Sequence, residues 1–245
     1  MSLVLCDVYS QRLEESAARA RERAPTSGTR VTTHLVDVSD ATQVQAFAEN
    51  VMASHGRVTL LVNNAGVALH GSFDELSLQD FEWLMRINFF GVVNCTKAFL
   101  PSLRREQSGH IVNISSILGI VAPPGQTAYA ASKFAIPGFT EALRHELAGS
   151  NVGVSCVHPG GIRTRIAEDG RIGSAAAGNK EAYAAAFARV ARHSPEFAAS
   201  KIVEGLKQNK RRILIGMEAH ALDALERLAP GRVAGAIRTG VATRE

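Results

Sequence analysis

The sequence predicts an α/β fold, in which a parallel sheet is wound on both faces by helices. Short runs rich in Val, Ile, Leu and Ala alternate with longer stretches whose apolar residues recur at helical spacing. Strands without an alternating polar face are typical of parallel sheets that are buried on both sides. The chain has no internal repeat and no long linker. We therefore expect a single domain over 1–229 and a frayed tail over 230–245.

The expected elements alternate along the chain. Strands are expected at 3–7, 29–39, 58–64, 110–115, 152–158 and 212–216. Helices are expected at 10–24, 40–56, 77–106 (as two helices in series), 129–148, 196–208 and 218–229. The Gly- and Ala-rich stretch between them, from 160 to about 195, carries only weak helical signals.

Two helices carry clear boundary and face signals. In the helix at 40–56 one stripe of apolar side chains is expected to face the core, and Gly56 is expected to end the helix. Ser77 can cap the helix that follows it. The stripe consists of Val44, Phe47, Ala48, Val51 and Met52.

Composition excludes several classes of protein. The formal charge of +4 is modest, and the densest basic run, at 207–212, reads as a solvated helix end rather than a nucleic-acid surface. Cys6, Cys95 and Cys156 lie far apart in apolar contexts, so we expect buried thiols, a cytoplasmic protein and no metal site. The sequence shows no apolar run of membrane-spanning length and no secretion signal, so we expect no membrane partner.

Three residues around one Gly/Pro-rich turn could carry proton chemistry. Ser116 follows the strand at 110–115, while Tyr129 and Lys133 lie four residues apart at the start of a helix and so share a face. A tyrosine hydroxyl has a reference pKa near 10, and a lysine ammonium one turn away favours the phenolate. A lone Tyr-x-x-x-Lys is more often a solvated surface pair, so the interpretation depends on the motifs that accompany it.

Those motifs end neighbouring strands of the expected sheet. They are "LVNNAG" at 61–66, "LVDVSD" with Asp37, and "VHPGGIRT" with Thr164. The carboxyl ends of parallel strands form the edge at which such sheets bind ligands. A dinucleotide and a proton-handling group would therefore meet at this edge.

With these motifs together, the chain resembles the short-chain dehydrogenase/reductase family over essentially its whole length. The resemblance implies a Rossmann-like fold and hydride transfer between an alcohol and a ketone or aldehyde, with NAD or NADP. It implies four catalytic residues: Asn88, which holds a water in a proton relay, Ser116, the general acid/base Tyr129, and Lys133, which binds the nicotinamide ribose. The implied cofactor-binding residues are Asp7, Asp37, Val38, Asn64, Ala65, Gly66, Tyr129, Lys133, Pro159, Gly160, Ile162 and Thr164, with Asn63 structural.

One element of the family is absent from the sequence. The family begins with a strand and a T-G-x-x-x-G-x-G turn, whereas "MSLVLCD" here resembles its second strand. With the first β-α unit missing, the first two expected strands are separated from the strand at 58–64 by a gap one strand wide, about 4.8 Å on either side. We consider an upstream start, a truncated or decayed gene product, and a variant that re-pairs its strands, and we favour the first. A chain that starts at Met1 is expected to bind the cofactor weakly and to have poor solubility.

Asp7 bears on the choice of cofactor. An acidic side chain at this strand end can accept hydrogen bonds from the ribose hydroxyls and would repel a 2′-phosphate. Val8 follows it, where NADP-dependent relatives often have Arg. We expect NAD rather than NADP, the alternative being that Asp7 merely caps the next helix.

The walls of the expected site are poor in charge, which favours an apolar alcohol or ketone, although Arg163 and Arg165 could admit an acid. The segment 170–188 is either a mobile lid or a short surface helix. The apolar helix that contains Phe89, Phe90 and Phe99 indicates a helix-mediated contact, and the family resemblance implies a homodimer or homotetramer.

Functions of other classes remain open alternatives. A serine hydrolase ranks lower because the sequence has no G-x-S-x-G motif. A metal enzyme ranks lower because spaced ligand clusters are absent. The serious alternative is a truncated, non-catalytic protein that keeps the fold while its cofactor binding is impaired.

Overall fold

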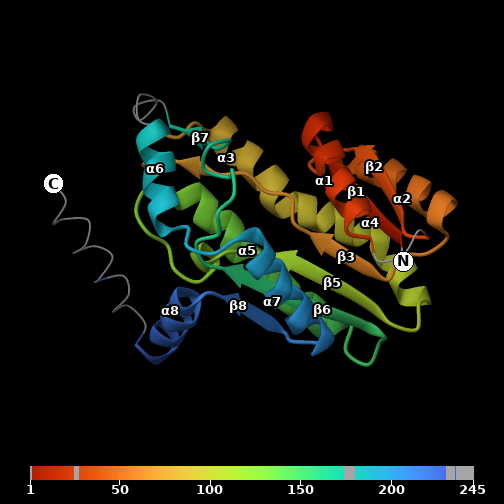
Figure 1. Cartoon of the computed structure of the whole chain (residues 1–245). Coiled ribbons are helices and arrows are strands. Elements are labelled where there is room, and N and C mark those ends of the chain that lie inside the picture. Colours follow the sequence, from red (N-terminus) through yellow and green to blue (C-terminus); the bar gives the residue numbers. More distant parts are fainter. Residues whose placement is uncertain (1, 25–27, 174–179, 230–234, 236–245) are drawn as a thin grey trace.

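Strands and helices alternate along the chain as the sequence predicts (Figure 1). The structure is a computed structural model that describes residues 2–24, 28–173, 180–229 and 235, so the expected tail at 230–245 lies outside the described residues except for residue 235. The strands are β1 (Ser2–Asp7), β2 (Arg30–Leu35), β3 (Leu60–Asn63), β4 (Leu69–His70), β5 (Gly109–Ile114), β6 (Val152–Pro159), β7 (Arg171–Ile172) and β8 (Arg212–Ile215). The helices are α1 (Ser10–Glu22), α2 (Ala41–His55), α3 (Leu78–Met85), α4 (Gly91–Arg105), α5 (Thr127–Glu146), α6 (Lys180–Val190), α7 (Pro195–Lys207) and α8 (Met217–Leu228).

The main strands are parallel but belong to two separate sheets. β1 pairs with β2, and β3, β5, β6 and β8 form a four-stranded sheet in the order β3-β5-β6-β8. Among the described residues the two sheets share no ladder, which confirms the expected separation of the first two strands from the third. At the β3 edge Leu60 and Val62 are 42% and 45% exposed, which is unusual for a strand of a parallel sheet.

Side-chain packing joins the two sheets although their backbones do not pair. One core cluster contains Val4 and Cys6 of β1 together with Leu61 of β3, and all of them pack with residues from α2 and α4, including Phe99. On the opposite face, α7 packs against the four-stranded sheet through a second cluster. Helices therefore cover both faces, as a doubly wound fold requires.

An ion pair also connects the N-terminal part to the rest of the chain. The two terminal guanidinium nitrogens of Arg12 on α1 donate to the Asp169 carboxylate, at 2.5 and 3.0 Å. The pair is about one third exposed on each side, so solvent screens it and it contributes little to stability. The shared core is the stronger connection.

Buried polar side chains cross the four-stranded sheet. The Asn63 amide donates to Asn113 at 2.8 Å, and Asn113 donates to the Thr140 hydroxyl on α5 at 3.0 Å. Asn63 also donates to Thr96 on α4 at 3.0 Å. All four residues are buried, and because a buried amide without partners costs about 1–3 kcal/mol, this chain fixes how α4 and α5 lie on the sheet.

Most local signals in the sequence are confirmed. The Asp40 carboxylate caps α2 by accepting from the N–H groups of Thr42 and Gln43, and Gly56 ends the helix with φ of 75°, in the left-handed region. Ser77 caps α3 by accepting from the Asp80 N–H. All three cysteines are free thiols, and Cys95 and Cys156 are buried.

The sequence missed two strands and overestimated the length of two others. Among the described residues β4 and β7 are two residues long and pair with each other, so they carry no local pattern. The strand expected at 58–64 spans only Leu60–Asn63. The strand expected at 29–39 ends at Leu35, because Val36 and Val38 turn into the core cluster instead of continuing the ladder.

His110 makes the stability of the fold sensitive to acid. Its Nε2 lies 2.8 Å from the Ser155 hydroxyl, which itself donates to the Lys210 carbonyl. Burial lowers the pKa of His110 from 6.5 to about 4. The unfolded chain therefore takes up this proton at a higher pH than the folded one, and stability is lost as the pH falls from 6.5 toward 4.

We expect the free energy of unfolding, measured with urea, to fall between pH 7 and pH 4.5. His110→Gln keeps a donor at the Nε2 position but does not titrate, so its loss over the same range should be smaller. Identical pH profiles for the two proteins would contradict this assignment.

Candidate active site

Ser116 lies at the carboxyl end of β5, where the chain turns into a short 3-10 segment (Ile117–Gly119). Its Oγ accepts from the Leu118 N–H at 3.1 Å. The preceding Ser115 donates to the Lys133 carbonyl on α5 at 2.8 Å, and so fastens the strand end to the helix. This brings Ser116 close enough to Tyr129 for its hydroxyl to influence the pKa of the phenol.

Tyr129 and Lys133 lie one turn apart on α5, as the sequence predicts. The Lys133 Nζ lies 5.7 Å from the centre of the Tyr129 ring and donates to the Ile114 carbonyl at 3.1 Å. Lys133 is only 3% exposed. The structure therefore brings together the serine, tyrosine and lysine that the sequence singled out.

Burial dominates the electrostatics of Tyr129 and Lys133. It raises the pKa of Tyr129 to about 12, although the neighbouring Ser116 hydroxyl lowers it in part. Burial also lowers the pKa of Lys133 to about 8. In the nucleotide-free protein, loss of hydration therefore dominates at both groups. The expectation that Lys133 together with an oxidised nicotinamide favours the phenolate stays a prediction.

Asn88 lies in a break between α3 and α4, as expected. The break is one turn of π-helix (Arg86–Phe90), a feature that often marks functional sites. The fully buried Asn88 amide accepts from the Val67 N–H at 2.8 Å and donates to the Val67 carbonyl at 3.0 Å. It also donates to the Ser132 hydroxyl on α5 at 3.1 Å.

The segment after β3 comes close to these residues. Asn64 and Ala65 are exposed, whereas Asn63 is buried. A Cβ added at Gly66 would lie 3.2 Å from Asn88 Oδ1 and 3.4 Å from Lys133 Nζ, so glycine leaves a small space beside both groups.

The other predicted cofactor residues lie at further strand ends. Asp7 is exposed and its Oδ1 accepts from the Tyr9 N–H at 3.0 Å. Asp37 is half-buried and accepts from the Ser39 N–H at 2.9 Å. The Val38 side chain is buried in the core cluster, and its carbonyl accepts from Asn94 at 3.0 Å.

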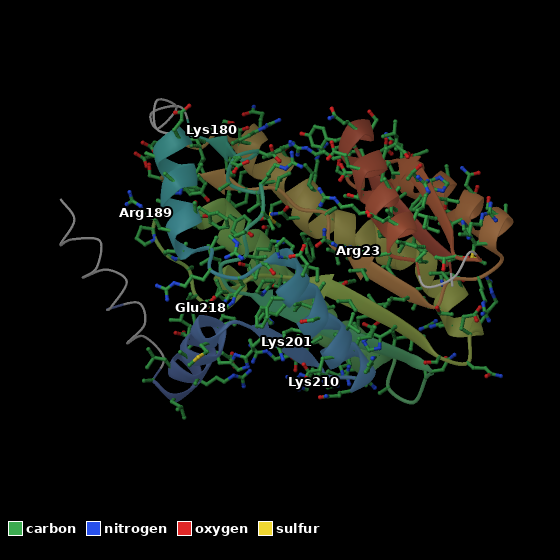
Figure 2. All side chains as sticks on the ribbon, viewed as in Figure 1. Arg23, Lys180, Arg189, Lys201, Lys210 and Glu218 are labelled. Atoms are coloured by element: carbon green, nitrogen blue, oxygen red, sulfur yellow. The ribbon has the colours of Figure 1, made fainter. Side chains whose placement is uncertain are left out.

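The Pro-Gly-Gly segment after β6 packs against α8. The Glu218 carboxylate, at the start of that helix in Figure 2, accepts from the Gly161 N–H at 3.2 Å and lies 3.2 Å from His193. Pro159 and Gly160 are half-buried, the Ile162 side chain packs into the core under α7, and Thr164 is exposed.

Thr164 lies in the wall of a cavity of about 500 Å³ between this segment and α6. Its lining combines charged residues of the segment with small apolar residues of α6, and consists of Arg163, Thr164, Arg165, Ala167, Glu168, Ala184, Phe187, Ala188, Ala191 and Pro195.

Sequence reasoning missed a polar cluster next to Tyr129. The Gln126 amide lies 2.9 Å from Nδ1 of His70, and the His70 ring stacks on Tyr183 of α6 with centres 4.5 Å apart. Tyr183 is close enough to Tyr129 to raise its pKa further. Gln126 is the residue just before α5 and lies three residues before Tyr129, so its place near the site could have been predicted from the sequence. The contacts of His70 and Tyr183 could not, because they join segments that are far apart in the chain. The segment 170–188, expected as a lid or a short surface helix, includes β7 and most of α6, and its residues 174–179 lie outside the described part of the chain.

Comparison with known proteins identifies the family. The family model described as short chain dehydrogenase matches residues 1–174. The chain is 42% identical over 243 residues to a protein of Mycobacterium tuberculosis named as the oxidoreductase SadH, covering 98% of this chain and 86% of that protein. The chain therefore belongs to the short chain dehydrogenase family of oxidoreductases.

Solved structures support the same fold. A short chain dehydrogenase/reductase from Burkholderia phymatum in complex with NAD is 31% identical with a TM-score of 0.82, covering 93% of this chain and 84% of that one. An alcohol dehydrogenase from Thermococcus sibiricus complexed with 5-hydroxy-NADP is 28% identical with a TM-score of 0.63, covering 69% of this chain and 70% of that one. The fold is thus Rossmann-like.

Within the described ranges no helix is long and apolar enough to cross a membrane. In the same part of the chain, His, Cys, Asp and Glu form no group of three or more that could hold a metal ion.

We expect Tyr129 to remain protonated up to pH 10 in the nucleotide-free protein, because burial destabilises the phenolate. The near-ultraviolet absorbance of phenolate, followed as a difference between the wild type and Tyr129→Phe, measures this ionisation. A midpoint well below pH 10 would show that Lys133 outweighs burial.

Proposed function

We propose that this protein interconverts an alcohol and a ketone or aldehyde by hydride transfer with NAD or NADP, with Tyr129 as the general acid/base. The observation that carries the proposal is the convergence of Ser116, Tyr129, Lys133 and Asn88 at the carboxyl ends of β3 and β5. Membership of an oxidoreductase family supports the same chemistry.

The residues around Gly66 fit a nicotinamide cofactor. Gly66 leaves space beside Lys133, and Lys133 is a nearly buried ammonium whose three N–H groups have a single hydrogen-bond partner, the Ile114 carbonyl, among the described residues. A bound ribose would supply acceptors for the remaining donors. When bound, the nicotinamide accepts or donates the hydride.

The proposed role of each side chain follows from its chemistry. Ser116 hydrogen-bonds the substrate oxygen and holds it against Tyr129. Tyr129 takes the hydroxyl proton in oxidation and returns it in reduction. Because burial holds its pKa high, Tyr129 needs added positive charge to act as a base, and Lys133 with an oxidised cofactor beside it supplies that charge. Asn88 holds the backbone of Val67 through two hydrogen bonds. The water that Asn88 is proposed to bind would be part of the proton path.

We further propose that one strand with a Gly-rich turn belongs between β1 and β3. Support comes from the described residues, in which the two sheets share no ladder and the apolar side chains of Leu60 and Val62 are exposed. This unit would bring backbone N–H groups to the pyrophosphate. A protein without this unit is expected to bind the cofactor weakly, so a non-catalytic protein with impaired cofactor binding is the second candidate function, favoured by the same interrupted sheet.

The proposed substrate is an apolar secondary alcohol or its ketone. The small apolar side chains of α6 support this, while Arg163 and Arg165 leave room for an acidic group. The stacking of Tyr183 on His70 places α6 beside Tyr129, and this position supports α6 as part of the proposed lid.

We also propose a homodimer or homotetramer through α4 and α5, supported by Phe90 and Phe134, which are 49% and 44% exposed. The cytoplasmic location stays a prediction from the three free thiols.

Tyr129→Phe should reduce kcat by at least about a hundred-fold, since general acid/base catalysis contributes 10²–10⁴. The assay follows absorbance of the reduced nicotinamide across a panel of secondary alcohols and ketones. Cofactor binding, measured as the rise in melting temperature on adding NAD, should be unchanged in the variant. Turnover that survives in Tyr129→Phe would refute the mechanism, whereas a wild type that neither binds NAD nor turns over would favour the second candidate.

The choice of cofactor is expected to depend on Asp7. Because its carboxylate would repel a 2′-phosphate, kcat/KM with NAD should exceed that with NADP by about ten-fold or more, the size expected of a charged hydrogen bond. Asp7→Asn should bring the ratio of kcat/KM with NAD to that with NADP closer to one. Glu15→Gln removes the same charge from the exposed face of α1 and should leave it unchanged. A wild-type preference for NADP would overturn the assignment.

A further inference from the structure

His158 is a buried histidine that the proposed mechanism does not use. It lies on β6 one residue before the Pro-Gly-Gly segment, with Leu214 of β8 as its partner in the ladder. Only 1% of its surface is exposed. Its neighbours on β6 are mostly apolar, so a buried histidine at this position needs an explanation.

The contacts of His158 show which of its ring nitrogens carries a hydrogen. Its Nδ1 lies 3.1 Å from the main-chain carbonyl of Ser116. A carbonyl oxygen only accepts, so Nδ1 carries a hydrogen and donates it. Burial lowers the pKa of His158 to about 4, so the ring is neutral near pH 7 and Nε2 holds a lone pair. That Nε2 is buried and has no hydrogen-bond partner within the described residues.

The charged groups that face His158 do not satisfy Nε2. Arg212 of β8 and Asp223 of α8 both act on the ring electrostatically. They pair with each other instead, with the two guanidinium nitrogens of Arg212 at 2.6 and 3.3 Å from the Asp223 carboxylate.

Packing alone therefore does not account for this histidine. An apolar side chain of similar volume would fill the same space without burying an unpaired acceptor. The Ser116 carbonyl would not be left unpaired either, because it also accepts from the Gly119 N–H at 3.0 Å. What the histidine adds is a second, rigid anchor on the backbone of Ser116, from a neighbouring strand of the sheet.

We propose that His158 is a positioning residue that holds the Ser116 backbone so that the serine hydroxyl faces Tyr129. The proposal rests on the proposed function, in which Ser116 orients the substrate oxygen. The Gly119 bond lies within the local turn and moves with it, whereas the His158 bond ties that turn to β6. Small displacements of such a hydroxyl are costly, because catalysis needs its oxygen within hydrogen-bond reach of the reacting group.

The test compares His158→Leu with His158→Asn. Asparagine presents its amide N–H near the position of Nδ1, so it keeps the donor while it loses the titratable ring. We expect His158→Leu to lower kcat by about ten- to a hundred-fold, the cost of a misplaced group, with the NAD-induced shift in melting temperature unchanged. His158→Asn should restore kcat to within about three-fold of the wild type, on the same reasoning.

A second readout does not depend on turnover. Hydrogen exchange of the amides of Leu118 and Gly119 reports how firmly the Ser116 turn is held. His158→Leu should speed this exchange at pH 7, while His158→Asn should not, with unchanged far-ultraviolet circular dichroism confirming that both variants fold.

The outcomes separate the two proposals. Loss of kcat in His158→Leu with rescue in His158→Asn supports positioning. Equal kcat in all three proteins, or equal loss in both variants, overturns it. If the wild type shows no turnover, the proposed function fails, and amide exchange alone decides whether His158 holds Ser116.

Discussion

The candidate site depends on the attachment of the β5 end to α5. Ser115 donates to the Lys133 carbonyl, and the Lys133 ammonium donates back to the Ile114 carbonyl, so two hydrogen bonds join the same pair of segments. A side chain at Gly119 would collide with this junction, since a Cβ there would lie 2.5 Å from the Lys133 carbonyl oxygen. The junction sets the distance between Ser116 and Tyr129, and therefore what the site can do with a proton.

Burial dominates the pKa values of Tyr129 and Lys133, and it makes an added positive charge necessary for the proposed reaction. The same loss of hydration raises the pKa of Tyr129 and lowers that of Lys133, so each group is disfavoured in its charged form. A positively charged ligand beside them would reverse this balance for the phenol. The proposed chemistry therefore requires a positive charge beside the phenol, which an oxidised cofactor would supply.

The core explains how a sheet in two parts remains one fold. α4 lies under β1 and β3 at once, and its residues Cys95 and Phe99 belong to the cluster that holds Val4, Cys6 and Leu61. The buried Asn63–Asn113–Thr140 chain then fixes α5 on the four-stranded sheet. Side-chain packing rather than backbone pairing therefore holds the β1–β2 sheet against the four-stranded sheet.

The sequence by itself determined the alternation of strands and helices, the helix end at Gly56, the cap at Ser77, and the spacing of Tyr129 and Lys133, because periodicity and capping are local. It also located the break at Asn88 through its family resemblance. Only the tertiary structure decided what depends on distant segments meeting: the β4–β7 pair, the stacking of His70 on Tyr183, and the bond from His158 to Ser116. The pKa of Tyr129 belongs to this second group, since it is fixed by how much of the fold surrounds the ring, and no spacing in the sequence records that.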